Sequence, residues 1–161
     1  MKSLRLASSL LLLTATAFAQ SGSQATFTKL KSLEGNWSGK SSDGRPVATS
    51  YRVTSGGSAL MGEIHSEDKM ISVFHMDGER LLMTHYCGAG NQPRMVGTVS
   101  PDGKTVTFNY LDATNLLPSQ PGHMERMVVT MIDANHYTEE WDFASKDGPK
   151  MHEVFDLQRA K

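Results

Sequence analysis

The sequence predicts an all-β protein, an up-and-down antiparallel barrel of about ten strands preceded by one short helix. Short runs rich in Val, Thr, Tyr, Phe and Met follow one another along most of the chain. Dipeptides that suit tight hairpins, such as Asp77-Gly78 and Asp102-Gly103, separate these runs. Nothing helical lies between them, so parallel crossovers are not expected. Because an open sheet of this size would leave two exposed edges, we expect it to close into a barrel.

The elements can be placed in order along the chain. The three-residue spacing of Phe27, Leu30 and Leu33 predicts a short helix within 24–34, which Gly35 would end. Alternating apolar and polar residues then predict the strands, at roughly 36–41, 46–55, 58–67, 69–76, 79–87, 93–100, 104–111, 123–132, 136–145 and 150–158.

Residues 1–19 have the layout of a secretory signal peptide. Lys2 and Arg5 come before an apolar run over 6–13, and Ala17-Phe18-Ala19 supplies a small-residue cleavage site. The run is too short to span a bilayer, which needs about 20 residues, so we expect no membrane anchor. The sequence therefore predicts an exported protein, periplasmic or secreted, with one domain over 20–161.

Composition limits the classes of partner and site. The formal net charge is −1, and it becomes −3 once Lys2 and Arg5 leave with the signal peptide. This balance argues against nucleic acid as a partner. Cys87 is the single cysteine, so an internal disulfide and a multi-cysteine zinc site are ruled out.

The hairpins indicate which side chains face the interior. With Asp77-Gly78 as a two-residue loop, Phe74 pairs with Leu81, and one face collects apolar residues. That face carries Met70, Phe74, Met76, Leu81, Met83, His85 and Cys87. With Asp147-Gly148 as the loop of the last hairpin, Phe143 pairs with His152, which places His152 among inward aromatic residues.

The predicted interior is either a lined cavity or a filled core. A closed ten-strand sheet is wider than an eight-strand barrel, and the nine methionines after Met1 adapt to varied apolar shapes. The predicted ligand-binding residues are Met70, Phe74, Met83, His85, Cys87, Tyr110, Trp141 and His152. The long connection over 112–122 is either a plain surface loop or a lid over the barrel mouth.

Two sets of polar residues allow chemistry to be considered. His85 and Cys87 share a strand face and could form a thiol-dependent catalytic pair if Arg94 supplied positive charge; the alternative is a buried thiol beside a core histidine. Glu63, His65 and Glu67 also share a face, as either a metal site or a solvated outer surface. Neither set is complete, so we assign no catalytic residue and no metal ligand.

The segment 33–39, with Gly35 before Trp37, resembles the calycin superfamily, the lipocalins and fatty-acid-binding proteins. The resemblance implies that Trp37 closes one end of the barrel with a late basic residue, here Arg159, packed on its ring. The stretch 83–95 is similar to one in small exported bacterial proteins of unknown function.

A weaker resemblance is to nitrobindin-like haem barrels, whose signature is similar to Gly-x-Trp-x-Gly-x-Gly. Gly35, Trp37 and Gly39 match it, whereas Ser41 stands at the last glycine. This resemblance implies a haem-binding histidine near the chain end, for which His152 is the matching position.

These observations favour an exported barrel that binds a small, mostly apolar molecule in its interior, with no cofactor and no assigned reaction. One alternative is haem or metal binding through His152 or His85. Another is a thiol-dependent enzyme that uses Cys87 and His85. The oligomeric state stays open.

Overall fold

A computed structural model describes residues 22–145 and 151–161, and it confirms the predicted fold class. The chain forms a closed antiparallel barrel in which each strand pairs with its sequence neighbours, and β1 closes the sheet against β10. The elements are α1 (Gly22–Leu30), a 3-10 turn (Lys31–Leu33), β1 (Gly35–Ser41), β2 (Pro46–Thr54), a 3-10 turn (Ser55–Gly57), β3 (Ala59–Ile64), β4 (Ile71–Asp77), β5 (Arg80–Tyr86), β6 (Gln92–Val99), β7 (Thr105–Thr114), β8 (His123–Asp133), β9 (His136–Ala144) and β10 (Met151–Arg159). The predicted signal peptide lies outside the described residues, and no described helix is long and apolar enough to cross a membrane.

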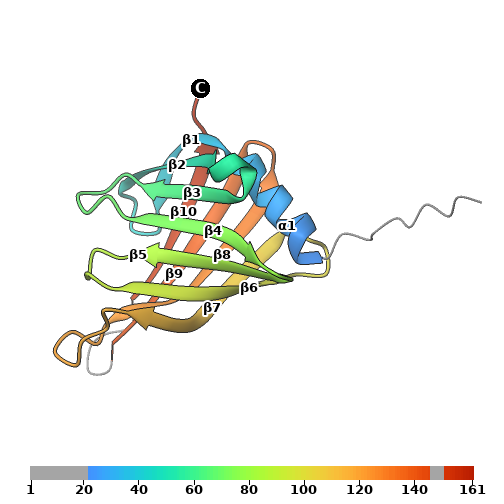
Figure 1. Cartoon of the computed structure of the whole chain (residues 1–161). Coiled ribbons are helices and arrows are strands. Elements are labelled where there is room, and N and C mark those ends of the chain that lie inside the picture. The colour runs from blue at the N-terminus through green and yellow to red at the C-terminus, as the bar shows by residue number, and fades with distance from the viewer. Residues whose placement is uncertain (1–21, 146–150) are drawn as a thin grey trace, which may run out of the picture.

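The two ends of the barrel differ. Helix α1 lies across one end, and the β3–β4, β5–β6 and β7–β8 connections extend from the other (Figure 1). The helix buries Phe27 and Leu30 in the barrel core. We call the helix-covered end the closed end and the opposite end the mouth.

Closure of the sheet depends on a close approach of β1 and β10. Gly39 pairs with Leu157, and a Cβ atom at Gly39 would lie 1.7 Å from the carbonyl oxygen of Asp156. Any side chain there would therefore push the two strands apart, which explains the glycine in the middle of a strand.

The predicted registers correctly identify the inward-facing side chains of β4 and β5, but they assign those of β10 to the wrong face. The first turn uses Gly78 and Glu79, so Phe74 pairs with Met83; this shift of two residues leaves the inward face unchanged. The last connection is longer than two residues, and His152 pairs with Asp142 instead of Phe143. That shift of one residue places His152 on the outer face of the barrel.

The long connection is shorter than expected because β7 continues to Thr114. Two side-chain amides join it to the β5–β6 turn. Asn91 Nδ2 donates to the carbonyl oxygen of Gly122, and Asn115 Nδ2 donates to that of Gly90; each donor–acceptor distance is 2.7 Å. The connection is thus held to its neighbour by hydrogen bonds at both of its ends.

Candidate functional site

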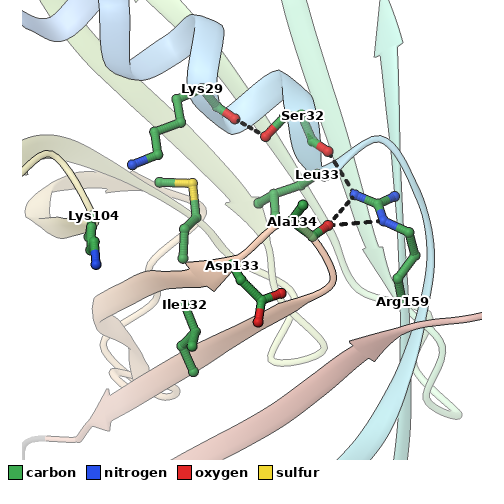
Figure 2. Close-up of a pocket in the computed structure, with 9 residues that line it drawn as sticks. Lys29, Ser32, Leu33, Lys104, Ile132, Asp133, Ala134 and Arg159 are labelled. Atoms are coloured by element: carbon green, nitrogen blue, oxygen red, sulfur yellow. Dashed lines mark hydrogen bonds between the residues drawn. The ribbon is translucent and has the colours of Figure 1, made fainter.

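The two residues predicted to close one end of the barrel, Trp37 and Arg159, pack against each other at the helix-covered end. The guanidinium carbon of Arg159 lies 4.1 Å from the centroid of the Trp37 ring, and the Trp37 indole NH donates to the carbonyl oxygen of Leu33 over 2.7 Å. Arg159 also donates to the carbonyl oxygens of Ser32 and Ala134 (Figure 2) and to that of Glu34. The predicted packing of Arg159 on Trp37 is therefore present, and the arginine ties the helix region to the β8–β9 turn as well.

The barrel interior is mostly a packed core. Phe74, Met83, Met95 and Phe108 are each no more than 1% exposed. Edge-to-face aromatic contacts link Phe74 to Phe108 and Trp37 to Tyr137, with ring centroids 5.3 Å and 4.7 Å apart. The structure thus favours the filled core over the lined cavity for this part of the barrel.

A buried carboxyl group lies at the centre of this core. Glu139 is 1% exposed, and its Oε1 accepts hydrogen bonds from the hydroxyls of Tyr51 (2.5 Å) and Tyr137 (3.0 Å). Its Oε2 accepts one from the Trp141 indole NH at 3.0 Å, while Thr49 Oγ1 lies 2.7 Å from the Tyr137 hydroxyl. Burial raises the pKa of Glu139, the three hydrogen bonds oppose that rise, and burial also raises the pKa of Tyr51.

Gly62 makes this cluster possible. Tyr51 pairs with Gly62 across β2 and β3, and a Cβ atom at Gly62 would lie 2.7 Å from the Tyr51 ring. The missing side chain leaves the space that the tyrosine ring fills on its way to Glu139.

His85 forms a second buried polar group. Its Nδ1 lies 2.9 Å from Ser72 Oγ, and its ring lies against Trp141, with centroids 4.8 Å apart. Its Nε2 is buried and has no hydrogen-bond partner among the described residues. Burial lowers the pKa of His85 to about 4, so the ring is neutral at physiological pH.

A small hollow lies between these polar groups. Its volume is about 10 Å³, and Thr49, Ile64, Ser72, Glu139 and Trp141 are among its lining residues. That is room for roughly one water molecule. The hollow is too small for an organic ligand.

A much larger pocket opens at the mouth, with a volume of about 530 Å³. The side chains of β1 to β3 and β10 form its inner wall, and the β1–β2 and β3–β4 connections form its rim. The residues of this mouth pocket are Ser41, Arg45, Pro46, Val47, Ile64, His65, Ser66, Glu67, Asp68, Met70, Glu153 and Phe155. Ile64, which is 8% exposed, lines both this pocket and the inner hollow.

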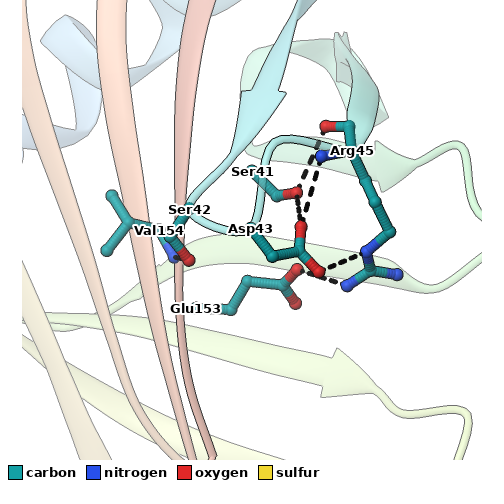
Figure 3. A network of polar contacts seen from close by, with 6 residues as sticks. All are labelled: Ser41, Ser42, Asp43, Arg45, Glu153 and Val154. Atoms are coloured by element: carbon teal, nitrogen blue, oxygen red, sulfur yellow. Dashed lines mark hydrogen bonds and ion pairs between the residues drawn. The ribbon is translucent and has the colours of Figure 1, made fainter.

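A polar network links side chains on one side of the rim. Arg45 Nε contacts Asp43 Oδ2 at 2.5 Å, and Arg45 Nη2 contacts Glu153 Oε1 at 2.9 Å (Figure 3). Ser41 Oγ donates to Asp43 Oδ1 at 2.5 Å. The Ser41 and Arg45 hydrogen bonds lower the pKa of Asp43 to about 2, so the network is ionised at neutral pH.

The predicted ligand-binding residues are divided between the core and the mouth. Phe74, Met83, His85 and Trp141 are buried in the core, where they contact other protein side chains. Met70 and Cys87 are partly buried against the core, and the Tyr110 ring lies tilted against that of His123, with ring centroids 4.3 Å apart. Met70 is the member of the predicted set that lines the mouth pocket.

The prediction that His152, the eighth residue of the set, faces the barrel interior is wrong. It lies on the outer face, more than half exposed, with Nδ1 2.6 Å from Asp142 Oδ1. Neither histidine of the haem alternative fits that group: His152 points away from the interior, and His85 faces a core that has no space for a porphyrin.

The remaining polar candidates also differ from the expected arrangement. Burial raises the pKa of the Cys87 thiol, the opposite of what a reactive thiolate needs. Arg94, expected beside Cys87, instead forms a two-pronged ion pair with Asp112. His65 Nε2 lies 2.9 Å from Ser50 Oγ on the outer face, and the described residues contain no cluster of three metal-ligating side chains.

Sequence reasoning missed Glu139, Tyr51 and Tyr137 as one buried cluster. The signal was available for Glu139, which alternates with Tyr137 and Trp141 and so shares their inward face. It also missed Val47 and Phe155, whose place in the mouth depends on the β1–β10 closure.

Comparison with known proteins supports the fold alone. No family model matches the chain, and no curated protein matches it. Among solved structures, Rv2717c from M. tuberculosis superposes with a TM-score of 0.54 at 16% identity, covering 84% of this chain and 98% of that one. A redesigned beta barrel matches with a TM-score of 0.34 at 13% identity, covering 91% of this chain and 100% of that one. The chain is therefore a closed ten-strand antiparallel barrel with a fold similar to that of Rv2717c.

Proposed function

We propose that the protein is an exported barrel that binds a small, mostly apolar molecule in its mouth pocket. The observation that carries the proposal is this pocket of about 530 Å³, whose inner wall includes Val47, Ile64, Met70 and Phe155. Sites for small molecules are concave, mostly apolar and roughly 300–1,000 Å³ in volume. The signal-peptide layout of residues 1–19 supports the export part of the proposal.

The binding mode differs from that of a barrel with an empty interior. The core below the mouth pocket is filled except for the small hollow beside Ile64, so the ligand would contact only the mouth end of the barrel. Apolar contacts would supply most of the affinity, and the polar rim would orient the ligand.

The test is a titration with N-phenyl-1-naphthylamine, a neutral apolar dye that fluoresces when it leaves water. We expect saturable binding by the unmodified protein and at least fivefold weaker binding by Met70→Gln, which places an amide in the pocket wall. Met61→Gln is the matched control, because Met61 lies on the opposite face of β3 from Ile64 and outside the mouth pocket.

Two results would overturn the proposal. One is the absence of saturable binding at dye concentrations up to its solubility limit. The other is an equal loss of affinity in both methionine variants, which would mean that the dye does not bind in the mouth.

A further inference from the structure

The rim of the mouth pocket carries an uneven set of charges. Arg45 is the single arginine or lysine among the lining residues, whereas Glu67, Asp68 and Glu153 supply three carboxylates. Asp43 and Lys69 flank the rim without lining the pocket, and their formal charges add up to zero. His65 adds charge only when it is protonated. Among the described residues, the rim therefore has an excess of two negative charges at neutral pH.

The positive charge of Arg45 is already occupied. Its guanidinium contacts Asp43 at 2.5 Å and Glu153 at 2.9 Å, so an incoming anion would have to compete with these two carboxylates (Figure 3). By contrast, Glu67, Asp68 and Lys69 have no ion pair with any described residue. These three unpaired groups are two carboxylates and one ammonium, so the unpaired charge at the rim is negative on balance.

Asp68 lies close to the β5–β6 turn. A Cβ atom at Gly88, in this turn, would lie 2.7 Å from Asp68 Oδ2, so the carboxylate occupies space that a side chain at Gly88 would take. Asp68 thus lies between the β3–β4 and β5–β6 connections of the mouth.

The pocket wall supplies an apolar surface beside the charged rim. Phe155 is 7% exposed and lines the pocket together with Ile64 and Met70. A cation held by the rim carboxylates could therefore place an attached alkyl chain against these apolar side chains.

We propose that the mouth pocket selects positively charged amphipathic molecules, with an ammonium group at the rim and an apolar body against Ile64, Met70 and Phe155. This inference rests on the proposed function, because it names the ligand class of the same pocket.

The test compares three molecules that share an octyl chain: octyltrimethylammonium, the neutral octyl glucoside and the anionic octanoate. Isothermal titration calorimetry of the full chain at low ionic strength measures each Kd below the micelle concentration. Two uncompensated charges near the rim should favour octyltrimethylammonium over octanoate by about tenfold or more. Raising the salt concentration to about 0.5 M should shrink that ratio, because exposed charges are screened.

Charge-neutralising variants locate the selectivity. The double variant Glu67→Gln/Asp68→Asn should bring the ratio close to one, by weakening the binding of octyltrimethylammonium and strengthening that of octanoate. The matched control is Glu79→Gln, which removes one exposed carboxylate in the β4–β5 turn at the closed end, far from the mouth.

The outcomes separate the two proposals. If none of the three molecules binds, the proposed function fails and the charge selectivity falls with it. If all three bind with similar Kd, or if octanoate binds best, small-molecule binding stands and the inferred ligand class is overturned. If Glu79→Gln changes the ratio as much as the double variant does, the selectivity does not come from the rim.

Discussion

The two ends of the barrel use arginine in opposite ways, although both arginines lie beside the same pair of strands, β1 and β10. At the closed end, Arg159 stacks on buried Trp37 and donates to three carbonyl oxygens. At the mouth, Arg45 is 70% exposed and pairs with the carboxylates of Asp43 and Glu153.

This difference between the Arg159 and Arg45 contacts predicts that one end of the barrel contributes more to stability and the other more to ligand binding. At the closed end every polar atom of the arginine fork meets a fixed backbone partner, so the contacts depend on one geometry. At the mouth the partners are flexible side chains in water, where ion pairs contribute little to folding and remain free to rearrange around a ligand. Stability is thus expected to concentrate at the closed end, and ligand selectivity at the mouth.

The strongest test of this comparison is the removal of Trp37. Its side chain is 1% exposed and packs between Arg159 and Tyr137. Trp37→Ala should lower the free energy of unfolding by roughly 3–5 kcal/mol, measured by urea denaturation followed by far-UV circular dichroism. Val47→Ala in the partly exposed mouth should cost about 1 kcal/mol, because less surface is lost from contact. Equal costs at the two ends would contradict the comparison.

The core between the two ends should make the fold sensitive to acid. The pKa of His85 is about 4 in the folded protein against 6.5 as its ordinary value, so the unfolded chain takes up the proton first. Stability should therefore be fully present above pH 6.5 and fall as the pH drops toward 4, by up to roughly 3 kcal/mol.

The ionisation of Glu139 changes stability in the opposite direction as the pH falls, so its effect must be separated from that of His85. Because its pKa is raised, its burial costs stability at high pH, and that cost disappears as acid protonates it. The difference in unfolding free energy between the unmodified protein and His85→Gln, measured from pH 7.5 to 4, isolates the histidine. A difference that does not change with pH would show that His85 is not buried in its neutral form.

The sequence was sufficient for most of the fold because hairpin chemistry and alternation are local. All ten predicted strands form, with ends within three residues of those observed. Met83 and His85 face inward as predicted although the predicted register is wrong, because a register error of two residues leaves every side chain on the same face.

His152 shows where the same reasoning fails. Its facing depended on the length of one turn, and an error of one residue moved it from the inside to the outside. The turn contains Asp147-Gly148, which suits a two-residue hairpin, but β9 ends at Ala144 and β10 begins at Met151. Dipeptide preference alone does not fix the length of a connection.

The candidate site was harder to predict because it is made of residues distant in the sequence. Ser41 and Phe155 pair only because β1 closes on β10, and Tyr51 reaches Glu139 across the barrel. Arg159 on Trp37 was the exception, and it came from a family resemblance rather than from any local pattern.

The finest test exchanges the two arginines for lysine, which keeps the charge and removes the planar fork. Arg159→Lys should cost roughly 1–3 kcal/mol, because one ammonium group cannot serve three carbonyl oxygens and the ring of Trp37 together. Arg45→Lys should leave the urea midpoint indistinguishable from that of the unmodified protein, since the Arg45 contacts are made in water. The paired measurement removes the effect of charge, which is the same in both variants. If Arg45→Lys proved as costly as Arg159→Lys, the mouth network would be a structural clamp, and the division of stability and recognition between the two ends would be wrong.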